Sequence, residues 1–278
     1  MAQIIISKKA GRRIKLVFFL ILSVLLVTIC VKRFGHLPRA THLTGWLLLS
    51  LMLILALYNG RKKIPFLPLA TSKGWLQFHI YAGFFTLLLF LGHLHFRLPT
   101  GGVECTLAVL YSLVMVSGFV GLFISRSFPK RLTSRGGEVI FEKIPIIRRD
   151  FREKAEALAL KSIPEAQAST LADFYVSELS DFFSGAQNFW THLLENRGPL
   201  NRLLKKIEDV SRFLNEKERA VMIQIAELVR QKDGLDYHRT LQLTLKLWLF
   251  VHIPLTYSLL ILSFVHLVLV YAFSGGTG

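Results

Sequence analysis

The stretches HIYAGFFTLLLFLGH, residues 79–93, and HIPLTYSLLILSFVH, residues 252–266, each place a histidine at both ends of a fifteen-residue apolar window. An α-helix turns by about 100° per residue, so a separation of fourteen residues leaves the two imidazoles within about 40° of the same side. The same separation places them about 21 Å apart along the helix axis. Each stretch therefore predicts a helix that offers two imidazoles, at two levels, on one face.

Both windows belong to long apolar blocks, which are typical of a membrane protein. Of the 278 residues, 52% are apolar. Five runs approach the roughly 20 residues that a helix needs to cross a bilayer. These runs cover residues 14–31, 44–59, 75–97, 103–126 and 243–272. A basic segment precedes the first run without a small-residue cleavage site after it, so we expect a retained anchor. The fold class that follows is an all-α membrane helical bundle with five transmembrane helices.

The polar segment between the fourth and fifth runs predicts a separate helical insertion. Its apolar side chains recur at three- and four-residue intervals, as in amphipathic helices. We expect transmembrane helices 1–4 in residues 1–126, a cytoplasmic helical insertion in residues 127–242, and the fifth transmembrane helix with a short external tail in residues 243–278. Within the insertion, a separate helix is expected in residues 215–231. The expected helix starts are Pro164, Pro199 and Asn215.

The net charge of +16 is concentrated in the apolar part of the chain. Of the 18 acidic residues, 17 lie in residues 127–242 beside 19 lysines and arginines, whereas Glu104 alone opposes the 15 basic residues elsewhere. This distribution argues against binding to nucleic acid and places the excess charge near lipid headgroups. The positive-inside rule predicts a cytoplasmic N-terminus and an external C-terminus, in a bacterial-type inner membrane.

The four histidines of the two windows are candidate metal ligands. An ionisable side chain in hydrocarbon is costly, so it marks a functional site. The third and fifth runs would cross the membrane in the same direction, so His79 can meet His252 and His93 can meet His266. Two imidazoles that face each other across a bundle supply both axial ligands of a low-spin iron porphyrin, and we expect two haem b groups. In the alternative interpretation, these histidines form hydrogen bonds between helices.

Other residues are candidates for contact with the porphyrin or its carboxylates. Gly83 and Gly92 would leave room beside the ligand face. The candidate counter-charges are Arg39 and Arg97 on the outer side, with Lys73 and Lys246 on the inner side. His95 lies about 200° around the helix from His93, away from the ligand face. His36 and His42 are expected in the first external loop, at solvated positions or, in the alternative, near the outer haem edge. His192 and His238 are expected on the surface of the insertion.

Other cofactor motifs are missing from the sequence. Its two cysteines, Cys30 and Cys105, form no CxxC or CxxCH motif, so covalent haem, zinc ribbons and cysteine-ligated clusters lack ligands. There is no GxGxxG, no GxxxxGK[ST], and no recognisable flavin or nicotinamide site. No residue is assigned a catalytic role.

The motifs His79-x13-His93 and His252-x13-His266 resemble those of the two-haem cytochromes b. Within that group, the chain is similar to the membrane domain of ferric reductases and NADPH oxidases, and to cytochrome b of quinol–cytochrome c oxidoreductases. The resemblance implies bis-histidine haem b on the third and fifth spans. It covers only these two helices, and the chain has neither a flavin module nor a PEWY-like quinol motif.

The function that follows is that of a haem b membrane subunit, which carries electrons across the bilayer. The expected partners are membrane lipids, the quinone pool or a cytoplasmic donor, and an extracytoplasmic redox protein such as a periplasmic multihaem cytochrome. One alternative is a membrane reductase of an external ferric chelate or oxygen, with electrons supplied by a separate flavoprotein. The other is a nonredox membrane scaffold with structural histidines.

Overall fold

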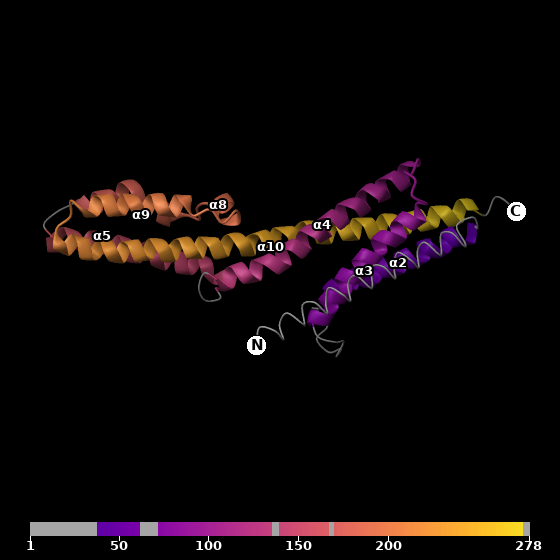
Figure 1. Ribbon diagram of the computed structural model, residues 1–278, viewed down its shortest axis with the longest axis horizontal. Coiled ribbons are helices and arrows are strands. Elements are labelled where there is room, and N and C mark those ends of the chain that lie inside the picture. The colour runs from indigo at the N-terminus through magenta and orange to yellow at the C-terminus, as the bar shows by residue number, and fades with distance from the viewer. Residues whose placement is uncertain (1–37, 62–71, 135–138, 167–169, 275–278) are drawn as a thin grey trace, which may run out of the picture. The chain divides into compact units, whose positions relative to one another are not determined.

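The computed structural model describes residues 38–61, 72–134, 139–166 and 170–274 (Figure 1). Every regular element within these ranges is helical, so the predicted all-α class is confirmed for them. The elements are α2 (Pro38–Arg61), α3 (Ser72–His93), α4 (Gly102–Thr133), the 3₁₀ turn η1 (Phe141–Lys143), α5 (Ile144–Ala166), α6 (Thr170–Phe174), the π-helical turn η2 (Tyr175–Leu179), α7 (Ser180–Ser184), α8 (Phe189–Leu193), α9 (Gly198–Ser211) and α10 (Glu216–Ser274).

Three helices in the described part of the chain are long and apolar enough to cross a membrane. They are α3, α4 and α10. Helix α2 contains a shorter apolar stretch, Thr41–Leu57. The first predicted spanning run, residues 14–31, lies outside the described residues. Three of the five predicted spans thus have a matching helix of sufficient length, and five transmembrane helices stay a prediction.

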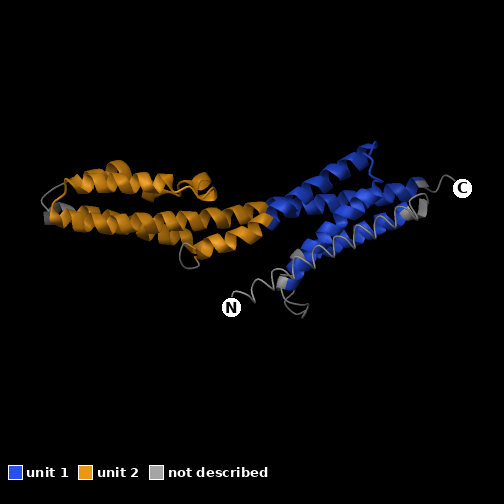
Figure 2. Cartoon of the chain, viewed as in Figure 1, with its two compact units in different colours: residues 1–122, 249–278 blue, residues 123–248 orange. Residues whose placement is uncertain are grey.

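The chain divides into two compact units (Figure 2). Unit 1 comprises residues 1–122 and 249–278, and unit 2 comprises residues 123–248. Helices α4 and α10 each contribute residues to both units. The described residues of the expected insertion, 127–242, all belong to unit 2.

Helix α10 differs from the expected pair of separate helices. It runs without interruption for 59 residues, a length of roughly 90 Å. A capping box begins it: Glu218 N donates to Asn215 Oδ1 at 2.9 Å, and Asn215 N donates to Glu218 Oε2 at 3.3 Å. Gly234 is the sole glycine between residues 216 and 242, and one glycine is tolerated inside a helix. The sequence between the two predicted helices therefore contains no strong terminator.

Helix starts are predicted at two prolines, and the structure confirms one of these predictions and contradicts the other. Pro199 occupies the first turn of α9, as predicted, where its missing N–H costs no hydrogen bond. Pro164, in contrast, lies in the last turn of α5, so the prediction of a helix start there is wrong. Pro164 has no N–H to donate to the carbonyl group four residues earlier, and α5 continues for only two residues beyond it.

Helix α3 ends in a Schellman motif centred on His95. His95 N donates to Gly92 O at 3.0 Å, and Phe96 N donates to Leu91 O at 3.1 Å. His95 has a φ of 52°, so this residue has the left-handed backbone conformation that glycine usually adopts at this position. His95 is exposed and lies beyond the last turn of α3.

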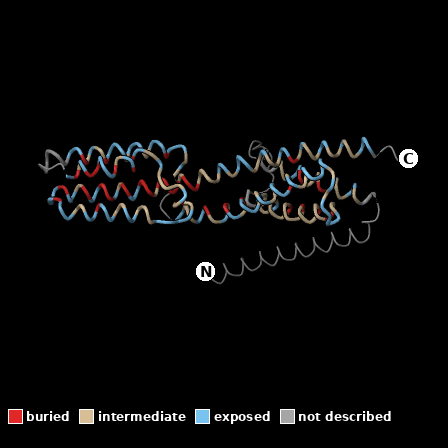
Figure 3. The backbone as a smooth tube through the Cα atoms, turned by 90° about the horizontal axis from the view of Figure 1, so that it is seen from above, coloured by how far each residue is buried: buried red, intermediate tan, exposed pale blue. Residues whose placement is uncertain are grey.

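The two units bury their apolar residues differently (Figure 3). In unit 1, one small core joins four helices through Leu48 and Met52 of α2, Leu89 of α3, Tyr111 of α4 and Leu259 of α10. Most other described side chains of α10 beyond residue 248 are exposed or half-buried although they are apolar, which suits contact with lipid.

Unit 2 instead has a larger apolar core. Its fully buried members come from several helices: Ala155, Leu171, Leu179, Phe183, Ile225 and Val229. Beside this core, Lys232 Nζ bonds to Asp236 Oδ2 at 2.5 Å and to Gly185 O at 2.7 Å, and both side chains of this ion pair are fully buried. Burial lowers the pKa of Lys232 and raises the pKa of Asp236, whereas each partner's charge acts in the opposite direction.

The prediction that His192 and His238 are surface residues is wrong. Both are buried in unit 2. His192 Nε2 lies 3.6 Å from Asp233 Oδ1, and its ring packs edge-on against Tyr237. The polar composition of the insertion suggested solvated histidines, but the contact of α8 with α10 buries His192, and His238 lies in the buried part of α10.

Candidate functional site

Helices α3 and α10 bring the four predicted ligand histidines together in two pairs. The imidazole of His79 is close enough to that of His252 to interact electrostatically. The imidazole of His93 is close enough to that of His266 and, with smaller effect, to those of His95 and His42. The pairs follow the same order along both helices, so α3 and α10 run parallel in unit 1. The fourteen-residue spacing separates the two levels by about 21 Å along each helix.

A hydroxyl of α2 orients the imidazole of His93. Thr44 Oγ1 lies 3.2 Å from His93 Nδ1 and donates its own proton to Thr41 O at 2.9 Å. A hydroxyl has one proton to donate, so His93 Nδ1 carries the hydrogen in the contact with Thr44. The Nε2 atom then holds the lone pair, which is the tautomer that a metal ligand requires.

A glycine of α2 permits this close approach. A Cβ atom at Gly45 would lie 3.1 Å from His93 Cε1, a distance tighter than most side chains accept. Any larger residue at this position would press on the imidazole ring. Gly45 therefore allows α2 to pack directly against His93, next to the hydroxyl that orients the ring.

One histidine of the other pair also contacts a neighbouring helix. His252 Nδ1 lies 3.1 Å from Ser117 Oγ of α4. His252 thus presents the same ring atom to a hydroxyl as His93 does. The contact of Ser117 with Nδ1 leaves Nε2 of His252 at the opposite edge of the ring.

A packed polar and aromatic contact lies midway between the two levels. Thr86 is seven residues from both His79 and His93, and it is buried. Its hydroxyl donates to Gly83 O at 2.8 Å and accepts a hydrogen bond from Tyr111 Oη at 3.1 Å. The Tyr111 ring stacks on Phe90 with centroids 4.0 Å apart. Side chains, rather than an open channel, therefore separate the histidine levels at this point.

The two predicted glycines differ in their surroundings. Gly83 lies one helical turn from His79, and a Cβ atom there would meet no atom within 4 Å. This position therefore offers room for a bulky group beside the histidine face. Gly92 is buried and belongs to the last turn of α3, where it accepts the hydrogen bond from His95.

The predicted counter-charges are only partly described. The side chains of Arg39 and Lys73 lie outside the described part of the structure. Arg97 is exposed in the segment that follows α3. Lys246 belongs to unit 2, where its Nζ lies 2.9 Å from Glu142 Oε1 and 3.7 Å from the centroid of the Phe141 ring. The ion pair with Glu142 lowers the pKa of that carboxyl group.

Sequence reasoning missed the side chains that orient the imidazoles. Thr44 and Ser117 lie in apolar runs, where a hydroxyl is a weak signal because it often bonds to its own helix. A pairing with a particular histidine depends on which faces of α2 and α4 meet α3 and α10. Sequence periodicity does not contain that information.

The ligand chemistry of the site rests on the histidine pairs. Among the described residues, no three or more His, Cys, Asp or Glu side chains form a group that would hold a metal ion. A porphyrin iron needs only two protein ligands, one on each side of the ring, and each pair supplies two imidazoles. The residues present therefore fit a bis-histidine haem at both levels.

The fold and the site define a class of all-α protein with membrane-length helices and paired internal histidines. No protein-family model, curated protein or solved structure compared with the chain matches it. The likeness to two-haem cytochromes b therefore rests on the two histidine motifs.

Proposed function

We propose that this chain is a multi-pass membrane cytochrome b that holds two haem b groups and carries electrons across the bilayer. The observation that carries the proposal is the pairing of His79 with His252 and of His93 with His266, at two levels of parallel helices. Haem b, when bound, supplies one-electron redox chemistry. The protein's part is to hold the haem groups, to orient them and to insulate them from water.

The residues around the pairs support this role through their hydrogen bonds. Thr44 holds the proton of His93 on Nδ1 and so keeps Nε2 available as a ligand. Ser117 contacts the corresponding atom of His252. The four-helix core around Leu89, Tyr111 and Leu259 keeps water away from the region between the levels. A nonredox scaffold needs polar partners for its histidines, but it does not need two matched levels.

The topology and the partners are part of the same proposal. The N-terminus lies in the cytoplasm and the C-terminus outside, in a bacterial-type inner membrane, in keeping with the distribution of basic residues. Electrons pass between the quinone pool or a cytoplasmic donor and an extracytoplasmic redox protein. The chain acts as an electron-transfer subunit rather than as an enzyme by itself.

The direct test is a reduced-minus-oxidised absorbance spectrum of protein purified from haem-replete cells. We expect the sharp bands of low-spin haem b and about two haems per chain in a pyridine haemochrome assay. A colourless preparation of folded protein would refute the proposal. Haem reduction by a quinol in the purified protein would then favour the quinone pool as donor over a separate flavoprotein.

A further inference from the structure

Helix α8 of unit 2 carries large apolar side chains that the described structure leaves exposed. Trp190 is 71% exposed, and Leu194, which follows the helix, is 77% exposed. The same short segment also has an inner side: His192 is buried, and Leu193 is partly buried. The exposed pair is therefore held on one side of a segment whose other side is packed.

The packing of Leu193 shows where α8 lies along α4 and α10. It packs in a cluster with Ile124 and Phe128 of α4, to which Trp248 of α10 also belongs. Ile124 precedes Arg126, the first cation of α4, and Trp248 belongs to the apolar run that begins at residue 243. Helix α8 therefore lies beside the points where the apolar runs of two membrane-length helices end.

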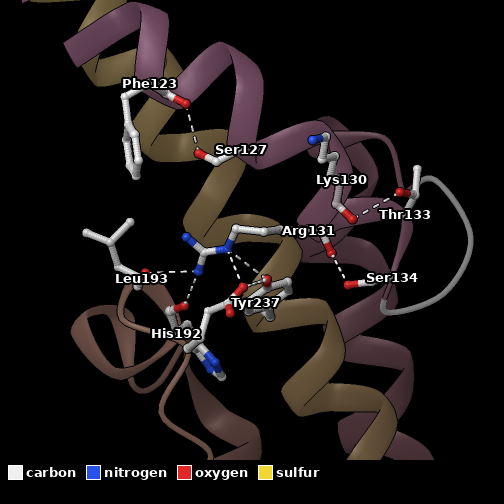
Figure 4. Close-up of polar contacts among 10 residues, drawn as sticks. Phe123, Ser127, Lys130, Arg131, Thr133, Ser134, His192, Leu193 and Tyr237 are labelled. Atoms are coloured by element: carbon white, nitrogen blue, oxygen red, sulfur yellow. Dashed lines mark hydrogen bonds and ion pairs between the residues drawn. The ribbon is translucent and has the colours of Figure 1, made fainter. Parts of the chain in front are cut away.

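Hydrogen bonds hold α8 at that level (Figure 4). Arg131 Nη2 donates to His192 O at 3.0 Å and to Leu193 O at 2.9 Å. Arg131 Nε also lies 2.6 Å from Glu195 Oε1, which accepts a hydrogen bond from Tyr237 at 3.1 Å. These bonds tie the end of α8 to both α4 and α10, so the segment has little freedom to move along them.

The distance along α4 matches the thickness of the lipid interface. Arg131 is five residues beyond Arg126, which corresponds to about 7.5 Å of helix. The headgroup region on each side of a bilayer is roughly 5–8 Å thick. The carbonyl groups that Arg131 binds therefore lie at headgroup depth when α4 crosses a membrane, and Trp190 and Leu194 extend from the same segment.

We propose that α8 is an interfacial anchor, whose Trp190 and Leu194 insert at the boundary between headgroups and acyl chains on the side of unit 2. Tryptophan and leucine are typical of such anchors, and the exposed Arg126 and Lys130 on α4 suit anionic headgroups. This inference rests on the membrane-crossing part of the proposed function. It does not depend on haem.

The test uses the full chain in phosphatidylcholine–phosphatidylglycerol vesicles, with Trp46, Trp75 and Trp248 replaced by Phe so that Trp190 alone fluoresces. Bromine near the headgroup end of the acyl chains quenches tryptophan on contact. We expect at least about twofold weaker emission in brominated than in ordinary vesicles. A ratio between two lipids cancels any constant quenching by haem.

Two control variants, in which Trp190 is also replaced by Phe, separate the possible failures. Phe264→Trp reports the fifth apolar run, where Phe264 is 62% exposed, and it should be quenched strongly. Phe213→Trp reports a side chain that is 85% exposed and precedes α10, whose first residue, Glu216, is about 38 Å along the helix from Leu241, and it should not be quenched. If Phe264→Trp is not quenched, the crossing itself fails. If it is quenched and Trp190 is not, the anchor alone is overturned.

A second reporter guards against disturbance by the Trp248 substitution. Leu194→Cys, in a background with Cys30 and Cys105 replaced by Ser, is labelled with an environment-sensitive fluorophore. We expect blue-shifted emission that aqueous iodide quenches several-fold less than the same label at Phe213→Cys. Equal quenching at the two positions would overturn the anchor. So would a label shielded from iodide but not affected by brominated lipid, since a protein surface would then cover α8.

Discussion

At the scale of single residues, the two levels of histidines predict that each haem can be lost independently of the other. Replacing His93 or His266 with Ala should remove one haem and leave most of the other, because the levels are about 21 Å apart. The pyridine haemochrome assay should fall from about two haems per chain to about one. His95→Ala is the matched control, because His95 is exposed beyond the end of α3. An equal loss from His95→Ala would contradict the assignment.

The buried ion pair of unit 2 predicts a large cost for removing one partner alone. Asp236→Ala leaves the ammonium group of Lys232 buried without its carboxylate, which costs about 3–5 kcal/mol of unfolding free energy. Adding Lys232→Met should recover most of that loss, since no charge is then buried. Thermal unfolding of the full chain in detergent, followed by circular dichroism, measures both.

An exposed ion pair provides the comparison. Asp150 bonds to Lys154 at 2.8 Å on the surface of α5, so Asp150→Ala should cost no more than about 0.5 kcal/mol. If Asp236→Ala and Asp150→Ala reduce stability equally, the buried pair does not have the role assigned to it.

At the scale of elements, the π-helical turn η2 predicts a tolerated deletion. A π turn holds one residue more than an α turn, so removal of the exposed Val176 returns the segment to an α-helix with both flanks in phase. Phe174 and Phe183 should then still face the core. We expect the deletion to cost about 1 kcal/mol or less.

Deletion of Glu153 from α5 is the matched control. It is also exposed, but it lies in a regular α-helix, so its removal turns all later residues by about 100°. Ala155 and Ala159 would leave the core, and unit 2 should lose several kcal/mol. Similar melting temperatures for the two deletions would argue against the structural explanation of η2.

At the scale of the whole molecule, the proposed topology predicts where the chain is accessible. Asp209→Cys in α9 should react with a membrane-impermeant thiol reagent only when the cytoplasmic face is open, because unit 2 is proposed to be cytoplasmic. Native Cys105, at the other end of α4, should react from the outside. Labelling of both positions from one side would refute the topology, although the parallel relation of α3 and α10 would survive.

Much of the fold follows from local sequence features. Pro199 and Asn215 mark helix starts through chemistry that involves only their own and the next few residues. The fourteen-residue spacing of the histidines places each pair on one face by helix geometry alone. Neither Thr44 nor the buried His192 follows in this way, since each owes its role to a side chain or helix distant in sequence.

Helical class, membrane-length runs and the register of the histidines are properties of short stretches, and the sequence predicts them without tertiary information because hydrophobic length and a 3.6-residue period are local. The hydroxyls that contact His93 and His252, the uninterrupted α10 and the burial of His192 and His238 required the tertiary structure. They depend on which helix faces pack together, and that choice is made by contacts between residues tens to hundreds of positions apart.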